Sequence, residues 1–363
     1  MTDAKPLPAL TPIGDNPTLL WGMTNAERLR RLARAEGLPE KASGVQLYVN
    51  LDYVFDPVWL RHIVTLPGTV VMDGGDLVMA HLTGGMTPAD IAPHRGALSI
   101  VDYRDNPQIY NRQLRKLDCP FIQRLTPATR RAIERKSYFG AYKGVTDALT
   151  LYLWRKPAFY LTRWAAEAKL TPNIVTAVGA ALCLLAFFYF WFGNYWLGVL
   201  AGFAFMVLDT VDGKLARCTG ASSKWGEAFD HGIDLIHPPF WYWAWAHGLD
   251  RYGTPLEPVY EAMLLAAIVG GYIAQRVIEG LFIARFKMHI HVWQQADSRF
   301  RLVTARRNPN MVLLVGALLF GRPDIGLELV ALWTIVSLIF HAVRFAQAEA
   351  KAYRGEPVTS WLA

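Results

Sequence analysis

Apolar residues gather in the second half of the chain, in runs that are each about as long as a membrane helix. Polar or charged residues separate six such runs, which cover residues 174–192, 196–216, 226–245, 259–283, 311–320 with its flanks, and 325–346. A helix needs about 20 predominantly apolar residues to cross the hydrocarbon core of a bilayer. The pattern predicts an α-helical integral membrane protein with six transmembrane helices, in a membrane domain over residues 171–350 that is followed by a C-terminal tail over 351–363.

Residues 1–130 show the mixed pattern of a small soluble α/β domain. Thr24 precedes a helical periodicity that ends at Gly37, with a glutamate three residues after the threonine, as at a capped helix N-terminus. β-branched and aromatic residues over 45–55 predict a strand. Residues 69–82 predict two strands around an Asp-Gly-Gly turn. We therefore expect this α/β domain to precede the membrane domain.

Residues 131–170 form a basic linker between these parts. Its second half, 149–170, interleaves Trp and Tyr with Arg and Lys, and Pro157 interrupts it. Aromatic and basic residues in alternation are typical of a helix at the membrane surface. The segment predicts an interfacial amphipathic helix that lies along the bilayer.

Composition agrees with a membrane protein. The chain has 363 residues, 53% of them hydrophobic, and a net charge of +7. Because the basic residues fall mainly at loop and helix ends, we expect them to face anionic lipid headgroups of the bilayer, with no nucleic acid as partner. The three cysteines show no metal or redox spacing, and the N-terminus lacks the apolar core of a signal peptide.

Four aspartates sit inside or at the edge of two apolar segments. They are Asp209 and Asp212, three residues apart, and Asp230 and Asp234, four residues apart. On helices, each pair projects from one face. Carboxylates at membrane depth are costly unless they are paired or bind a metal. Oxygen ligands suit hard divalent cations, so the cluster predicts a Mg²⁺ or Mn²⁺ site.

Small residues and an arginine accompany these aspartates. Gly213 and Ala216 leave room near the backbone of the first helix, and Gly226 does so on the second. Arg217 offers a forked donor set suited to phosphate oxygens. Together these residues describe a site for a nucleotide linked through a pyrophosphate.

The whole pattern resembles the signature of the CDP-alcohol phosphotransferase family. Over residues 209–234 the chain reads Asp-x-x-Asp-Gly-x-x-Ala-Arg, eight residues, then Gly-x-x-x-Asp-x-x-x-Asp, and all eight fixed positions match. The resemblance implies metal-dependent transfer of a substituted phosphate group from a CDP-alcohol to an acceptor alcohol, with release of CMP, in phospholipid or related polar-lipid biosynthesis. It also implies a homodimer.

The resemblance also implies the role of each residue. Two metal ions would be held by Asp209, Asp212, Asp230 and Asp234, and Asp234 would also be the catalytic base, since it is the last of the four and the least committed to metal. The nucleotide would be bound by Asp209, Gly213, Ala216, Arg217 and Gly226. A Pro-Asn-x-x-Thr element near the nucleotide pocket of family members is matched here and adds Asn173 and Thr176, although the same residues would also simply start a helix.

The basic loop over 297–310 is a second candidate site. Its arginines are Arg299, Arg301, Arg306 and Arg307. They would bind the phosphate of an acceptor such as inositol phosphate or glycerol phosphate, or they would anchor the loop to lipid headgroups, and both readings stay open. The donor would be CDP-diacylglycerol with a polar acceptor, which is favoured, or a CDP-linked head group with a lipid acceptor. Arg276 and Glu279, inside the fourth predicted span, are expected to pair with each other.

The N-terminal domain weakly resembles the nucleotidyltransferase-like domain that is fused to inositol-phosphate cytidylyltransferases of the same family. The glycine-rich, Arg-containing phosphate loop expected after the first strand is missing from residues 6–18. We therefore predict a degenerate, non-catalytic cytoplasmic domain.

Charge in the loops predicts the orientation. The loops after the second and fourth predicted spans are rich in Lys and Arg, whereas the opposite loops hold only Arg251 and Arg322. By the positive-inside rule, both termini and the active site face the cytoplasm of a bacterial- or archaeal-type membrane.

Two other functions would also explain membrane carboxylates. An aspartate-rich prenyltransferase would release pyrophosphate instead of CMP. A divalent cation transporter would carry metal without any nucleotide, but no broken-helix repeat of the transporter kind is visible.

Overall fold

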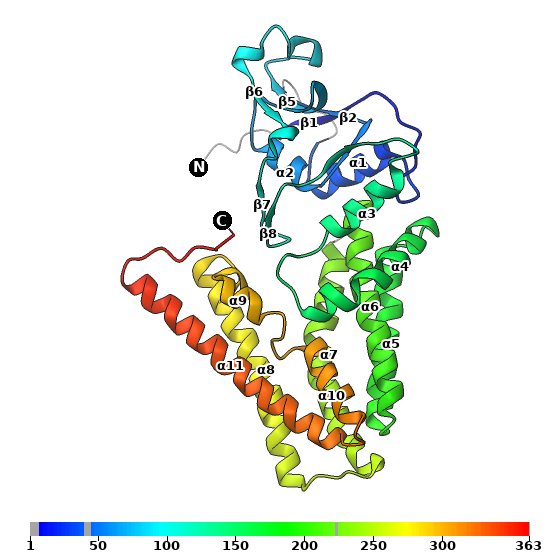
Figure 1. Ribbon diagram of the computed structural model, residues 1–363, viewed down its shortest axis with the longest axis vertical. Helices are drawn as coiled ribbons and strands as arrows, with labels where there is room; N and C mark the ends of the chain where they lie inside the picture. The colour runs from blue at the N-terminus through cyan, green and yellow to red at the C-terminus, as the bar shows by residue number, and fades with distance from the viewer. Residues whose placement is uncertain (1–6, 40–44, 222–223, 363) are drawn as a thin grey trace. The chain divides into compact units, whose positions relative to one another are not determined.

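The structure, a computed structural model, describes residues 7–39, 45–221 and 224–362, with the side chains of Lys224, Trp225 and Glu227 left out. The chain divides into two compact units (Figure 1). The first unit comprises Met1–Tyr142, Leu161–Pro172 and Gly213–Ser223. The second comprises Lys143–Tyr160, Asn173–Asp212 and Lys224–Ala363.

The first unit is built on a mixed sheet of five strands in the order β1-β2-β5-β4-β6. The outer neighbours, β1 with β2 and β4 with β6, run parallel, whereas β5 is antiparallel to β2 and β4. The strands are β1 (Ala9–Ile13), β2 (Val45–Asn50), β4 (Thr69–Asp73), β5 (Asp76–Thr83) and β6 (Ser99–Asp102). Two short ladders join β3 (Tyr53–Phe55) to β9 (Ile122–Arg124) and β7 (Ile109–Asn111) to β8 (Lys116–Asp118).

Helices α1 (Asn25–Ala35) and α2 (Val58–Val64) complete the core of this sheet, and α3 (Arg130–Gly140) follows β9. Leu29 of α1 and Trp59 of α2 are buried in one apolar cluster with Leu47 and Val49 of β2. Val70 and Ala80 belong to a second cluster. Because strand residues alternate between faces, the sheet is covered on both sides.

The local predictions for this unit are confirmed. The Thr24 hydroxyl accepts the backbone N–H of Glu27 at 3.2 Å and caps α1. Gly74 and Gly75 both have positive φ, as the tight turn between β4 and β5 requires. The strand predicted over 45–55 is divided, because the Asn50 side chain accepts the N–H of Asp52 and turns the backbone between β2 and β3.

The last turns of α6 also belong to the first unit. The buried Arg28 guanidinium donates to the carbonyl of Cys218 at 3.2 Å and to that of Phe55 at 3.3 Å. Lys214 is buried with its ammonium 3.0 Å from the centre of the Tyr142 ring. Lys214, a basic residue at the end of the second predicted span, therefore packs on an aromatic ring.

The second unit consists of long helices with short connecting segments. These helices are α5 (Pro172–Trp191), α6 (Tyr195–Thr219), α7 (Lys224–Tyr252), α8 (Pro258–Phe286), α10 (Arg307–Leu318) and α11 (Pro323–Tyr353). Between α8 and α10 lie a 3₁₀ turn, Ile290–Val292, and the short α9 (Gln295–Phe300). Ahead of them a π-helical turn, Leu149–Leu153, leads into α4 (Arg155–Glu167), which belongs to the first unit from Leu161 onward.

Among the described residues, four helices are long and apolar enough to cross a membrane, namely α5, α6, α8 and α11. The prediction of six spans is thus supported for four. The predicted fifth span is not confirmed, because α10 has 12 residues, about 18 Å at 1.5 Å per residue, against a hydrocarbon core of about 30 Å. Helix α7 has the length, but polar residues and Pro238 and Pro239 dilute its apolar character.

Aromatic side chains form the centre of the second unit. Trp241 and Trp245 of α7 are buried, and their indole N–H groups donate to the carbonyls of Cys183 and Pro323, each at 3.0 Å. The hydroxyl of Tyr195 donates to the carbonyl of Trp245 at 2.6 Å. Buried indole and phenol groups are stable only with such partners, so these bonds fix how α5, α6, α7 and α11 pack.

The segment predicted to lie along the membrane is helical with exposed aromatic residues. Tyr152 and Tyr160 are 76% and 68% exposed, as expected of side chains at a headgroup layer. The helix is interrupted at Trp154, between the π-helical turn and α4, and not at the predicted Pro157, since proline is tolerated in the first turn of a helix.

Candidate metal and nucleotide site

Three of the four motif aspartates converge in the second unit. Asp209 on α6 and Asp230 and Asp234 on α7 each offer a carboxylate oxygen, and these oxygens all lie within 4.8 Å of one another. The regular turns of the two helices bring them together, because residues four apart on α7 share one face. An all-oxygen, acidic ligand set of this size fits Mg²⁺ or Mn²⁺.

The fourth aspartate is held by the Pro-Asn-x-x-Thr element. The Thr176 hydroxyl on α5 donates to Asp212 Oδ2 at 2.6 Å, and both side chains are buried. The structure thus joins a helix start and a motif aspartate that lie 36 residues apart. Asn173, in the first turn of α5, is exposed.

The other predicted nucleotide-binding residues lie on α6 and α7. A Cβ atom added at Gly213 would come 3.0 Å from Arg217 Nη2, so this glycine makes room for the Arg217 guanidinium. Ala216 and Arg217 are half-buried on α6, and Gly226 is half-buried on α7. The sequence predicts room beside Gly213, and in the structure the guanidinium of Arg217, from the same motif, takes that room.

Arg307, the first residue of α10, bridges two of the converging aspartates. Its Nη2 lies 2.7 Å from Asp209 Oδ2, and its Nη1 lies 2.7 Å from Asp234 Oδ1. The guanidinium is 14% exposed and lies 4.9 Å from the centre of the Phe205 ring. A planar fork can bond two carboxylates at once, as no lysine can. Arg307, predicted to bind an acceptor phosphate, therefore contacts the predicted metal ligands.

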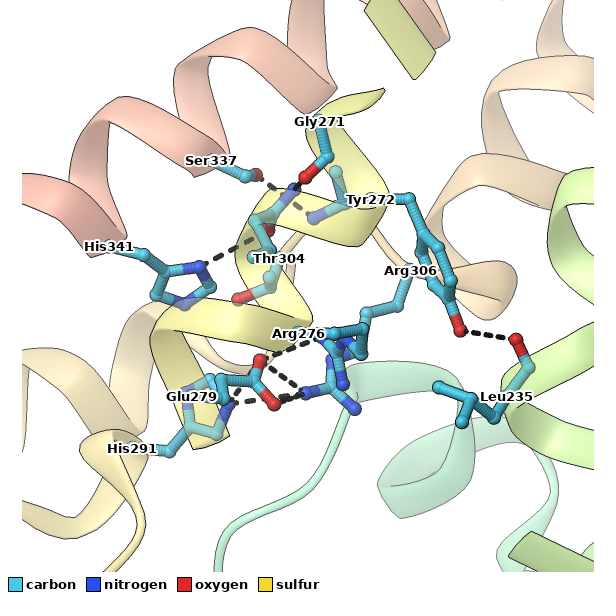
Figure 2. Close-up of polar contacts among 12 residues, drawn as sticks. Leu235, Gly271, Tyr272, Arg276, Glu279, His291, Thr304, Arg306, Ser337 and His341 are labelled. Atoms are coloured by element: carbon cyan, nitrogen blue, oxygen red, sulfur yellow. Dashed lines mark hydrogen bonds and ion pairs between the residues drawn. The ribbon is translucent and has the colours of Figure 1, made fainter. Parts of the chain in front are cut away.

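The four arginines of the basic loop do not form one cluster. Arg306 turns to Glu279 of α8, whose two carboxylate oxygens accept from its Nη2 at 2.6 and 2.7 Å (Figure 2). Arg301 is buried near Asp147, and Arg299 is exposed. Position in a basic loop therefore gave no information about which partner each arginine would have.

Glu279 gathers three basic side chains (Figure 2). Besides Arg306, it accepts from Arg276 Nη2 at 2.7 Å, which confirms the predicted pair, and it lies 3.2 Å from His291 Nε2. Burial lowers the pKa of His291 well below its usual range, so this imidazole is neutral at physiological pH. Glu279, His291 and His341 also have the spacing of a metal site, but both oxygens of Glu279 already accept from arginines.

Asp147 and Asn308, which no sequence pattern singles out, hold the start of α10. Asp147 accepts from Asn308 Nδ2 at 2.8 Å and from the hydroxyl of Thr150 at 2.8 Å. Burial opposes ionisation of Asp147, but Arg301, Asn308 and Thr150 together hold its pKa below the ordinary value. Asp147 is therefore a buried anion that fixes the residue next to Arg307.

Comparisons with known proteins agree with the motif. The family described as CDP-alcohol phosphatidyltransferase matches residues 169–354, about half of the chain. Cholinephosphotransferase 1 of Gallus gallus is 34% identical over 129 residues, 32% of this chain and 36% of the relative. Archaetidylinositol phosphate synthase of Pyrococcus horikoshii is 36% identical over 85 residues, 23% of this chain and 44% of the relative. The chain therefore spans less than half the length of these relatives.

Proposed function

Since the chain belongs to the CDP-alcohol phosphatidyltransferase family, we propose that it transfers a substituted phosphate group from a CDP-alcohol to the hydroxyl of an acceptor alcohol and releases CMP. This activity would serve phospholipid or related polar-lipid biosynthesis, with CDP-diacylglycerol as the donor. One observation carries the proposal: the eight-residue signature is complete, and three of its carboxylates converge.

The carboxylates would hold the metal on which the reaction depends. Asp209, Asp230 and Asp234 would be ligands, and Asp212, oriented by Thr176, would be the fourth. When bound, two Mg²⁺ or Mn²⁺ ions neutralise the donor's diphosphate and stabilise the leaving CMP.

Asp234 is best placed to act as the general base. It is the most accessible of the converging carboxylates, with a side chain that is 43% exposed against 18% for Asp209. In this role Asp234 would accept the proton of the acceptor alcohol while the oxygen attacks the phosphorus.

The nucleotide would lie against the small residues of the motif. Arg217, beside Gly213, would bind the diphosphate of the donor with its forked donor set. The cytidine would be bracketed by Asn173, Ala216 and Gly226. Arg306 would bind an acceptor phosphate, because two contacts link its surroundings to Asp234. The neighbouring Arg307 donates to Asp234. The hydroxyl of Tyr272 donates to the carbonyl of Leu235, the residue next to Asp234 (Figure 2).

The names of the relatives point to different polar groups for the lipid product. One is named for choline phosphate transfer and another for the synthesis of an inositol phosphate lipid. Arg306 and the other basic residues of its loop favour a phosphate-bearing acceptor such as inositol phosphate. We also propose that the protein is a homodimer, that its active site and both termini face the cytoplasm, and that the N-terminal domain is a degenerate nucleotidyltransferase-like domain.

Release of CMP by the purified protein in lipid tests the reaction. CDP-diacylglycerol with a panel of polar acceptors would be compared with CDP-linked head groups and lipid acceptors, each with Mg²⁺ or Mn²⁺. We expect metal-dependent CMP with one pair and none after Asp212→Asn. Pyrophosphate in place of CMP would favour the prenyltransferase, and metal flux without nucleotide would favour the transporter.

A further inference from the structure

Arg307 neutralises the carboxylates that a divalent cation would use. Its guanidinium contacts Asp209 and Asp234, two of the three converging aspartates, at 2.7 Å each. It is largely buried, and a buried arginine keeps its charge. Three carboxylates so close together repel one another, and a cation that bridges two of them relieves this repulsion. The guanidinium therefore reduces the repulsion between these aspartates, as a bound metal ion would.

A metal ion and this guanidinium would compete for the same carboxylates. Both are attracted by the same negative charge, and Arg307 already uses Asp209 Oδ2 and Asp234 Oδ1. A divalent cation among the three carboxylates would also be repelled by the arginine, and this repulsion is strong where water is scarce. Tight binding of metal thus requires the guanidinium to leave its two partners.

The backbone around Arg307 is anchored on both sides, so the exchange needs only the arginine side chain to move. Arg306 is fixed to Glu279, and Asn308 is fixed to Asp147 at 2.8 Å. The guanidinium itself also lies near the Phe205 ring, which can hold a cation without any carboxylate.

We propose that Arg307 and a divalent cation compete for Asp209 and Asp234, so that the cation binds by displacing the guanidinium from both carboxylates. This inference rests on the proposed function, because it takes the three aspartates as metal ligands. It assigns Arg307 a role in metal binding instead of acceptor binding.

Mn²⁺ affinity of Arg307 variants tests the exchange. The protein in lipid nanodiscs would be stripped with a chelator and titrated with Mn²⁺, with unbound Mn²⁺ followed by its electron paramagnetic resonance signal. We expect Arg307→Gln to bind Mn²⁺ about tenfold more tightly or better, because the competing charge is gone. Arg307→Lys keeps a charge but cannot bridge both carboxylates, so a smaller gain of about threefold is expected.

Arg285→Gln is the matched control. It removes the same charge at the end of α8, where that charge is paired with Glu349 and not with the aspartates. Its Mn²⁺ affinity should stay within about threefold of that of the wild type.

The melting temperature, measured with and without Mn²⁺, is a second test, and it can be read even if a variant is less stable than the wild type. Without metal, Arg307→Gln should melt below the wild type, since the carboxylates lack a counter-ion. Added Mn²⁺ should raise its melting temperature by more than it raises that of the wild type, because at one ligand concentration the stabilisation grows with the logarithm of the ratio of that concentration to Kd.

Unchanged or weaker Mn²⁺ binding by Arg307→Gln would overturn the inference and make Arg307 a residue that orients the carboxylates. If Arg307→Gln shows such binding while the wild type releases CMP in a metal-dependent way, the proposed function stays intact. A wild type that binds no Mn²⁺ yet releases CMP would overturn the exchange and the metal dependence together, and absence of both would overturn the proposed function as well.

Discussion

Thr176 controls the orientation of Asp212 through one short, buried hydrogen bond. The hydroxyl donates to Asp212 Oδ2 at 2.6 Å, and each residue is less than 10% exposed. Thr176→Val keeps the shape of the side chain and removes the donor. A hydrogen bond to a charged group contributes about 1.5–3 kcal/mol. If this energy serves to hold Asp212 in its active orientation, CMP release should fall about 10- to 150-fold, at 1.4 kcal/mol per factor of ten.

The assay is the initial rate of CMP release as a function of Mg²⁺ concentration. Because Asp212 is a proposed metal ligand, we expect part of the loss to be recovered at high Mg²⁺. Thr176→Ser is the control, since it keeps the hydroxyl and should stay within about threefold of the wild type. Wild-type rates and Mg²⁺ dependence in folded Thr176→Val would show that Asp212 is positioned by other contacts, and the reasoning would be wrong.

Three further changes probe the base, the polar network and the packing. Asp234→Asn should lower the rate of CMP release by about 10²–10⁴-fold, as for loss of a general base, and full turnover would refute the assignment. Glu279→Gln leaves two arginines without their carboxylate and should cost about 3 kcal/mol in a denaturant titration, whereas Glu349→Gln, at an exposed pair, should cost less than about 0.5 kcal/mol. A Cβ atom at Gly248 would overlap a backbone carbonyl of α5, so Gly248→Ala should lower the melting temperature sharply; Gly270→Ala, with open space around it, should leave that temperature nearly unchanged.

Patterns that depend on neighbours along the chain were readable from the sequence. The cap at Thr24, the Asp-Gly-Gly hairpin and the Arg276–Glu279 pair each involve residues a few positions apart, and the structure confirms all three. The convergence of the motif carboxylates was also foreseeable, because the spacing places Asp230 and Asp234 on one helix face.

Partners of the basic loop were not readable in this way. Arg306 and Arg307 are adjacent in sequence, yet one contacts Glu279 and the other Asp209 and Asp234. Arg306 has extended backbone angles, whereas Arg307 is the first residue of the helix, so the two side chains face different elements. Asn308 and its partner Asp147 lie 161 residues apart. No local pattern specifies such a pair.

The start of α10 follows from these contacts. Arg306, Arg307 and Asn308 are consecutive, and each is bound to a different anion of the second unit. Arg306 still has extended backbone angles, whereas Arg307 begins the helix. A helix that continued N-terminally past Arg307 would turn Arg306 into a regular helical position and move its guanidinium away from Glu279. Helix α10 therefore begins where three polar contacts fix the backbone, and these contacts place Arg307 beside the carboxylates.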